Sequence, residues 1–148
     1  AFARSVLQLK DANSAEFDYD CQHPIKHYMQ EQRELLSKGG TMRLGAYPST
    51  IKKGTQLERA YQKNHIAERH RHRFEFNNAY RASFEEHGMC ISGVSPDDAL
   101  VEAIEYSAND FYIGVQYHPE FKSRPHRAHP LFIDFIKYAK QLDKKDYE

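Results

Sequence analysis

The sequence predicts an α/β fold, and three observations support this class. Apolar residues alternate with polar or small ones over 42–47 and 74–77, and a period of two is typical of strands with one apolar face. The near-continuous apolar run from Phe111 to Tyr117 predicts a strand that is covered on both faces. After His129, apolar residues recur at helical spacing, and Pro130 suits the first position of a helix.

The composition of the 148-residue chain excludes several classes of protein. Lys plus Arg and Asp plus Glu number 21 each, so there is no net charge to hold nucleic acid or an anionic membrane. The apolar runs are too short to span a bilayer, and 13% aromatic residues argue against disorder. The 2 cysteines indicate a reducing, cytoplasmic compartment, although a Cys21–Cys90 disulfide stays open. We therefore expect neither a nucleic acid nor a membrane as partner.

Spacing and turn chemistry predict the elements of the first half. Phe2, Val6 and Leu9 recur at helical spacing, so a helix should run to about Lys10. Asp11–Ser14 should form a turn, because these side chains hydrogen-bond the nearby backbone in place of a helix. The elements expected next are a strand over 25–29, a loop over 37–40, and a strand with an apolar face of Met42, Leu44 and Ala46.

Helix ends are the clearest signals in the second half. Thr55 and Glu58 have the spacing of a capping box, so a helix should begin at Gln56. Gly88 is suited to end the helix that precedes it. The other expected elements are a strand over 74–76, a helix marked by Tyr80, Phe84 and His87, a turn over Ser95–Asp98, and a last helix with Leu131, Phe135 and Leu142 on one stripe.

The sharpest candidate for catalysis is the pair His118 and Glu120, directly after the expected buried strand. Residues two apart in extended backbone point the same way, and Pro119 biases His118 towards extended conformations. A carboxylate beside an imidazole fixes its tautomer and stabilises the imidazolium. The pair could thus be the base and the orienting acid of a catalytic triad. The alternative is a strand-end turn with a solvent-facing histidine.

The run Glu68–Phe74 allows several interpretations. A phosphate or RNA patch is disfavoured because the run is short and the net charge is zero. His70 and His72 would share a strand face near His65, but no cysteine pair accompanies them, so we expect no metal site. An arginine here could bind a small carboxylate, or the run could simply be a polar segment before the next strand.

A nucleophile is not evident in this sequence. Cys90 lies in an expected strand, and Cys21 has no evident base or helix N-terminus to lower its pKa. No Gly-x-Cys-x-Gly or Gly-x-Ser-x-Gly elbow occurs. Since the chain starts partway along an expected helix, we expect that an upstream part of its domain is missing.

Several segments resemble the glutamine amidotransferase domain of the CTP synthase family. They are GGTMRLGA at 39–46, ERHRHRFE at 68–75, SG at 92–93, GVQYHPEF at 114–121, SRP at 123–125 and HPLF at 129–132. His-Pro-Glu marks the wider class I amidotransferases, whereas the first two segments indicate CTP synthases. The resemblance implies a class I glutamine amidotransferase-like fold, with a mixed central sheet flanked by helices and the N-terminal part missing. Residues 1–148 would be the C-terminal portion of that domain, without a second domain.

The resemblance also implies a function in pyrimidine biosynthesis. The full enzyme would make CTP from UTP with ammonia from L-glutamine. ATP and Mg²⁺ would bind a synthetase domain of the same polypeptide, and this chain would hold no cofactor. The full enzyme would be a cytoplasmic homo-oligomer, a tetramer.

Four residues match functional positions of the family. His118 matches the triad histidine and Glu120 the triad glutamate, while Glu16 and Arg73 match glutamine-binding residues. A carboxylate suits the α-ammonium of glutamine and a guanidinium its α-carboxylate. The family's nucleophilic cysteine would lie upstream of Ala1, so we expect the chain alone to be inactive.

Two alternatives remain open at this level. A non-catalytic amidotransferase-like binding module fits the missing nucleophile, although the presence of all four functional residues disfavours it. The amidotransferase domain of another glutamine-dependent synthase is disfavoured by the arginine-rich run.

Overall fold

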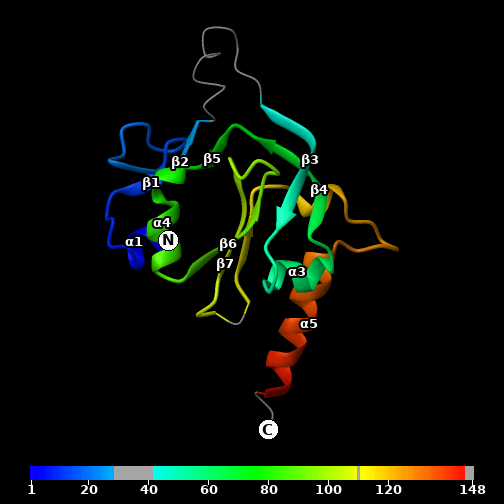
Figure 1. Cartoon of the computed structure of the whole chain (residues 1–148). Coiled ribbons are helices and arrows are strands. Elements are labelled where there is room, and N and C mark those ends of the chain that lie inside the picture. Colours follow the sequence, from blue (N-terminus) through cyan, green and yellow to red (C-terminus); the bar gives the residue numbers. More distant parts are fainter. Residues whose placement is uncertain (29–41, 110, 146–148) are drawn as a thin grey trace.

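The computed structural model describes residues 1–28, 42–109 and 111–145, which form two sheets with helices beside them (Figure 1). The helices are α1 (Phe2–Ser5), α3 (Gln56–Tyr61), α4 (Arg81–Glu86) and α5 (Pro130–Lys145), with 3₁₀ turns η2 (Asn78–Tyr80) and η3 (Pro119–Phe121). The strands are β1 (Ala12–Ser14), β2 (His23–Tyr28), β3 (Arg43–Ile51), β4 (His65–His72), β5 (Phe74–Phe76), β6 (Met89–Val94), β7 (Val101–Tyr106) and β8 (Ile113–Val115). The loop expected over 37–40 and the last residue of the strand expected over 25–29 lie outside the described residues.

The two sheets differ in how their strands pair. The larger sheet has the order β4-β3-β6-β7-β8, and every neighbouring pair is antiparallel. The smaller sheet has the order β1-β2-β5 and is mixed, because β1 runs parallel to β2 and β5 antiparallel to it. In Figure 1, α1 and α4 lie beside the smaller sheet, and α3 and α5 lie together below the larger one. The predicted α/β class is confirmed.

Two helix ends form as the sequence predicts. Thr55 Oγ1 accepts the N–H of Glu58 at 3.1 Å, and the Glu58 carboxylate accepts the N–H of Gly54 at 2.7 Å, so α3 begins at Gln56. Gly88 follows α4 with φ of +90°, a conformation that glycine adopts without steric cost. The strands at 25–28 and 74–76 and the turn between β6 and β7 are also confirmed.

The predictions for the N-terminal segment were partly wrong. Helix α1 ends at Ser5 rather than near Lys10, and Gln8 has a φ of +57°, which a helix does not allow. The segment expected as a turn contains strand β1, because Ala12 is 5% exposed and pairs with His23 of β2. Pairing with the next strand therefore overrides the local preference of these polar residues for a turn.

Strand β3 turns the opposite face to the interior from the one predicted. Leu44, on the face expected to be buried, is 64% exposed, whereas Arg43 is 8% exposed. The Nη1 atom of Arg43 lies 2.5 Å from Oε1 of Glu102 on β7. A buried carboxylate without a partner is costly, so this ion pair decides which face of β3 points inward.

The apolar run at 111–117 forms only a short strand at the edge of the larger sheet. Residues Ile113–Val115 are half-buried and pair with β7, so the prediction of a strand covered on both faces was wrong. The other apolar residues of the run have separate contacts. The Phe111 ring lies 5.6 Å from that of Phe135 on α5, and Tyr117 is buried in the cluster around α3.

Two apolar clusters hold the helices against the sheets. Ala3, Phe76, Phe84, Met89 and Ile91 belong to the cluster that joins α1 and α4 to both sheets. Leu57, Ile51, Ala103, Tyr117 and Leu131 form the cluster that joins α3 and α5 to the larger sheet. The predicted stripe of α5 is only partly buried, since Phe135 is 52% exposed, and the Leu142 side chain lies outside the described residues.

None of the helices in the described ranges has both the length and the apolar character that crossing a membrane requires.

Leu57→Ala should lower the free energy of unfolding by about 2–5 kcal/mol, because it leaves a cavity at a fully buried position. Leu44→Ala removes the same atoms from an exposed position and should change it by no more than about 0.5 kcal/mol. Urea denaturation of both variants measures the difference. Equal losses would contradict the orientation of β3 described above.

Candidate active site

His118 and Glu120 form a hydrogen-bonded pair at the surface. Nδ1 of His118 lies 2.7 Å from Oε1 of Glu120, and their side chains are 37% and 56% exposed. A carboxylate accepts, so Nδ1 carries the proton and Nε2 is the basic nitrogen of the neutral ring. The expected pairing is present, but a 3₁₀ turn that begins at Pro119 brings the side chains together, not the alternation of a strand.

Strand β4 and the neighbouring ring fix the position of His118. Its backbone N–H donates to the carbonyl of Arg69 at 2.9 Å. The imidazole stacks on Phe121, with ring centroids 4.7 Å apart and planes inclined by 19°. Both contacts leave the ring at the surface, where a substrate could reach it.

The pair is arranged to hold a negative charge on Glu120. The hydrogen bond from His118 is the main cause that lowers the pKa of Glu120, and a backbone hydrogen bond adds to it. An ionised carboxylate at this distance stabilises an imidazolium. The arrangement can therefore support a histidine that takes up and returns a proton.

Glu16 and Arg73 both border the smaller sheet. Glu16 is exposed in the loop after β1, and Arg73 is exposed between β4 and β5. In the described ranges, no hydrogen bond or ion pair joins either side chain to His118 or Glu120. Arg73 is nevertheless linked to the His118 segment, because the carbonyl of its neighbour Phe74 accepts Nε2–H of Gln116 at 3.1 Å.

Neither cysteine has the surroundings of a nucleophile. Both are free thiols, so the Cys21–Cys90 disulfide does not form. Burial and the negative charges of Asp18 and Asp11 raise the pKa of Cys21. Burial also raises the pKa of Cys90, which lies within β6. A raised pKa keeps a thiol protonated and unreactive at neutral pH.

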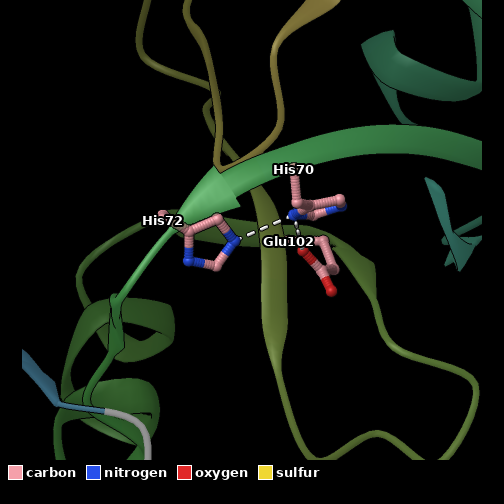
Figure 2. A group of neighbouring side chains, drawn as sticks. All are labelled: His70, His72 and Glu102. Atoms are coloured by element: carbon pink, nitrogen blue, oxygen red, sulfur yellow. Dashed lines mark hydrogen bonds and ion pairs between the residues drawn. The ribbon is translucent and has the colours of Figure 1, made fainter. Parts of the chain in front are cut away.

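A cluster of polar side chains lies in the larger sheet, two of them buried and one half-buried. It consists of His70 and His72 on β4 and Glu102 on β7 (Figure 2). The sequence predicted that the two histidines share a face, but His65 is exposed at the far end of the strand and takes no part. Glu102 was missed, although an acidic residue inside the apolar strand Val101–Tyr106 was a signal for it.

The histidines of this cluster are neutral at physiological pH. Burial and the positive charge of Arg43 lower the pKa of His70 to about 3. Burial lowers the pKa of His72 to about 4, which the hydrogen bond to the carbonyl of Phe74 partly opposes. The possible ligand atoms of the cluster lie within 4.8 Å of one another. However, Arg43 forms an ion pair with Glu102, so the protein itself supplies the counter-charge of this carboxylate.

Comparison with known proteins places the chain in a family. The family model for glutamine amidotransferase class-I matches residues 3–138, so the chain belongs to the class I glutamine amidotransferases. Its relatives include the CTP synthase of Aquifex aeolicus (strain VF5), 53% identical over 144 residues, which are 97% of this chain and 27% of that protein. The CTP synthase of Moorella thermoacetica (strain ATCC 39073 / JCM 9320) is 55% identical over 135 residues, 91% of this chain and 25% of that protein.

A solved structure agrees with these relatives. The Trypanosoma brucei CTPS glutaminase domain with bound acivicin has a TM-score of 0.87 and 36% identity, and the match covers 95% of this chain and 55% of that one. The resemblance to CTP synthases is thus confirmed. The chain spans about a quarter of the length of the two curated relatives.

The buried histidines should make the unfolding free energy fall as the pH is lowered from about 7 to about 5. Unfolded histidines, with a pKa near 6.5, take up protons that folded His70 and His72 do not, and each adds a slope of up to about 1.4 kcal/mol per pH unit. Because burial raises the pKa of Glu102, that carboxyl acts in the opposite direction.

Comparing variants isolates the contribution of His72 to the slope of the unfolding free energy against pH. Urea denaturation at several pH values should show a shallower slope for His72→Gln, by about one proton, than for the parent protein. His65→Gln, an exposed change on the same strand, provides the matched control. An unchanged slope in His72→Gln would contradict a depressed pKa for His72.

Proposed function

We propose that this chain is the glutaminase portion of a CTP synthase and helps to release ammonia from L-glutamine. The observation that carries the proposal is the pair His118–Glu120, with Nδ1 and Oε1 2.7 Å apart at the surface of a class I amidotransferase fold. The high identity to CTP synthases favours this enzyme over other glutamine-dependent synthases.

The pair suits the hydrolysis of an amide through a thioester. A thiol would attack the side-chain carbonyl carbon of glutamine while Nε2 of His118 takes the thiol proton. The C–N bond then breaks, and the same proton passes to the departing nitrogen, which leaves as ammonia. Water hydrolyses the glutamyl thioester to glutamate with His118 again as base, and the thiol is restored. Glu120 holds the ring in place and stabilises its cationic form.

The attacking thiol would come from outside these 148 residues. Cys21 is buried beside acidic residues and Cys90 lies within a strand, so neither is suited to the role. The chain alone would therefore be inactive. In the full polypeptide, a synthetase domain that binds ATP and Mg²⁺ would use the ammonia to convert UTP to CTP. We place that enzyme in the cytoplasm as a homotetramer.

Glu16 and Arg73 would bind the amino-acid end of the substrate. Both are exposed beside the smaller sheet and carry opposite charges, as the α-ammonium and α-carboxylate of glutamine require. The Gln116–Phe74 hydrogen bond places the backbone next to Arg73 against the segment that leads to His118.

His118→Ala in the full-length enzyme should lower glutamine-dependent CTP formation by about 10²–10⁴-fold, since it removes the group that carries the proton. Activity with added ammonia should persist. Glu120→Gln should cost less, because it changes orientation and charge but keeps the base. Steady-state assays with glutamine and with ammonium chloride measure both activities, and His87→Ala, a change of the exposed histidine at the end of α4, is the control. A parallel loss of both activities would contradict the assigned role.

Arg73→Lys should raise the glutamine KM about tenfold, because lysine keeps the charge but loses the two-pronged geometry that matches a carboxylate. The KM for ammonia should not change, since ammonia has no carboxylate. Arg71→Lys, a change on the exposed neighbouring position of β4, is the matched control. An unchanged glutamine KM in Arg73→Lys would refute a binding role for this residue.

A further inference from the structure

The His72 side chain closes a hydrogen-bonded ring around Arg73. Nδ1 of His72 lies 2.9 Å from the carbonyl oxygen of Phe74, so the side chain spans the residue between them. A carbonyl oxygen only accepts, so Nδ1 must carry a proton. The backbone of Arg73, between β4 and β5, is thus tied to the residue before it and the residue after it.

His70 contacts the opposite side of the His72 imidazole. Nε2 of His72 lies 2.9 Å from Nδ1 of His70 (Figure 2). Neutral His72 carries its one proton on Nδ1, so its Nε2 accepts and Nδ1 of His70 donates. His70 is 1% exposed, and its Nδ1 is 3.6 Å from Oε2 of Glu102, which is itself paired with Arg43. We call this series of contacts, from Glu102 through His70 and His72 to the Phe74 carbonyl, the relay, and it begins in the buried interior of the larger sheet.

The end of this relay also locates the segment before His118. The Phe74 carbonyl that accepts from His72 also accepts from Nε2 of Gln116, at 3.1 Å. The backbone N–H of Gln116 donates to the carbonyl of Glu102 at 2.8 Å. One buried network thus determines the position of the Arg73 backbone and of the strand end that leads to the catalytic pair.

We propose that His72 is a positioning residue for glutamine binding, which sets the direction of the Arg73 guanidinium through the Phe74 carbonyl. This inference rests on the proposed function, because it takes Arg73 to be the group that binds the α-carboxylate. His72 does not touch the substrate. It acts through its hydrogen bond to the backbone, with the proton held on Nδ1 by His70.

The alternative occupant of the cluster is a divalent metal ion bound by His70, His72 and Glu102. Such an ion would place two positive charges in the interior next to the buried guanidinium of Arg43, 2.5 Å from the carboxylate that would be its ligand. Like charges in a low-dielectric interior repel strongly. The hydrogen-bonded relay avoids this cost.

Two amide substitutions distinguish the contribution of Nδ1 of His72 from that of Nε2. The amide nitrogen of asparagine falls near the position of Nδ1, so His72→Asn keeps the donor to Phe74. Glutamine reaches the position of Nε2, so His72→Gln keeps only the contact with His70. In the full-length enzyme, His72→Gln should raise the glutamine KM about tenfold, the effect of losing about one hydrogen bond at a buried acceptor, and His72→Asn should raise it much less.

Both variants should keep the ammonia-dependent activity, and His65→Gln, an exposed change on the same strand, should behave as the parent. An equal rise in the glutamine KM of both variants, or no rise in His72→Gln, would overturn the inference. The proposed function would then still stand on the His118 and Arg73 variants, whose outcomes do not depend on His72.

A spectroscopic measurement on the parent protein tests the inference even if a variant fails to fold. In protein labelled with ¹⁵N-histidine, long-range ¹H–¹⁵N spectra report which ring nitrogen carries the proton. The His70 and His72 rings should both be protonated on Nδ1 at pH 7, and a His72 proton on Nε2 would refute the relay. One equivalent of zinc in the purified enzyme, retained by the parent protein and lost in His72→Asn, would instead identify a metal site and overturn the proposal.

Discussion

The ion pair between Arg43 and Glu102 is the constraint on which the rest of the larger sheet depends. The two side chains are 7% and 0% exposed, and the pair joins β3 to β7 across β6. Removing both charges from water costs several kcal/mol per ion, which only a close partner offsets. Assembly of the sheet without this pair would leave a buried charge, so the pair fixes the inward face of β3 and the place of β7 together.

The same pair determines what the neighbouring histidines can do. A guanidinium beside His70 and burial around both rings keep them neutral, so they act as fixed donors and acceptors and not as bases. His118, on the surface, has a carboxylate as its partner in place of a guanidinium. The chain thus holds two neutral histidines for fixed hydrogen bonding, and the exposed histidine is the one for which we propose proton transfer.

A second buried acid, Glu68, supports the other side of the segment that leads to His118. Glu68 Oε1 accepts the hydroxyl of Tyr61 at 3.0 Å and lies 3.2 Å from Nε2 of His129 at the start of α5. The Tyr61 hydroxyl is 3.2 Å from that of Tyr117, whose ring packs edge-on against His70. Tyr117 therefore lies between two buried polar networks. The backbone N–H of the next residue, His118, donates to the carbonyl of Arg69 on β4, so buried elements position this exposed imidazole.

The sequence by itself determined the local features of this protein: the cap at Thr55, the end of α4 at Gly88, the strand at 74–76 and the pairing of His118 with Glu120. Each depends on residues a few positions apart, whose chemistry has one favourable local arrangement. Only the tertiary structure decided the inward face of β3, the pairing of β1 and the edge position of β8. It also decided that Glu102 meets His70 and Arg43. In those cases the deciding partner lies in another strand, and the cost of an unpaired buried charge or strand outweighs the local pattern.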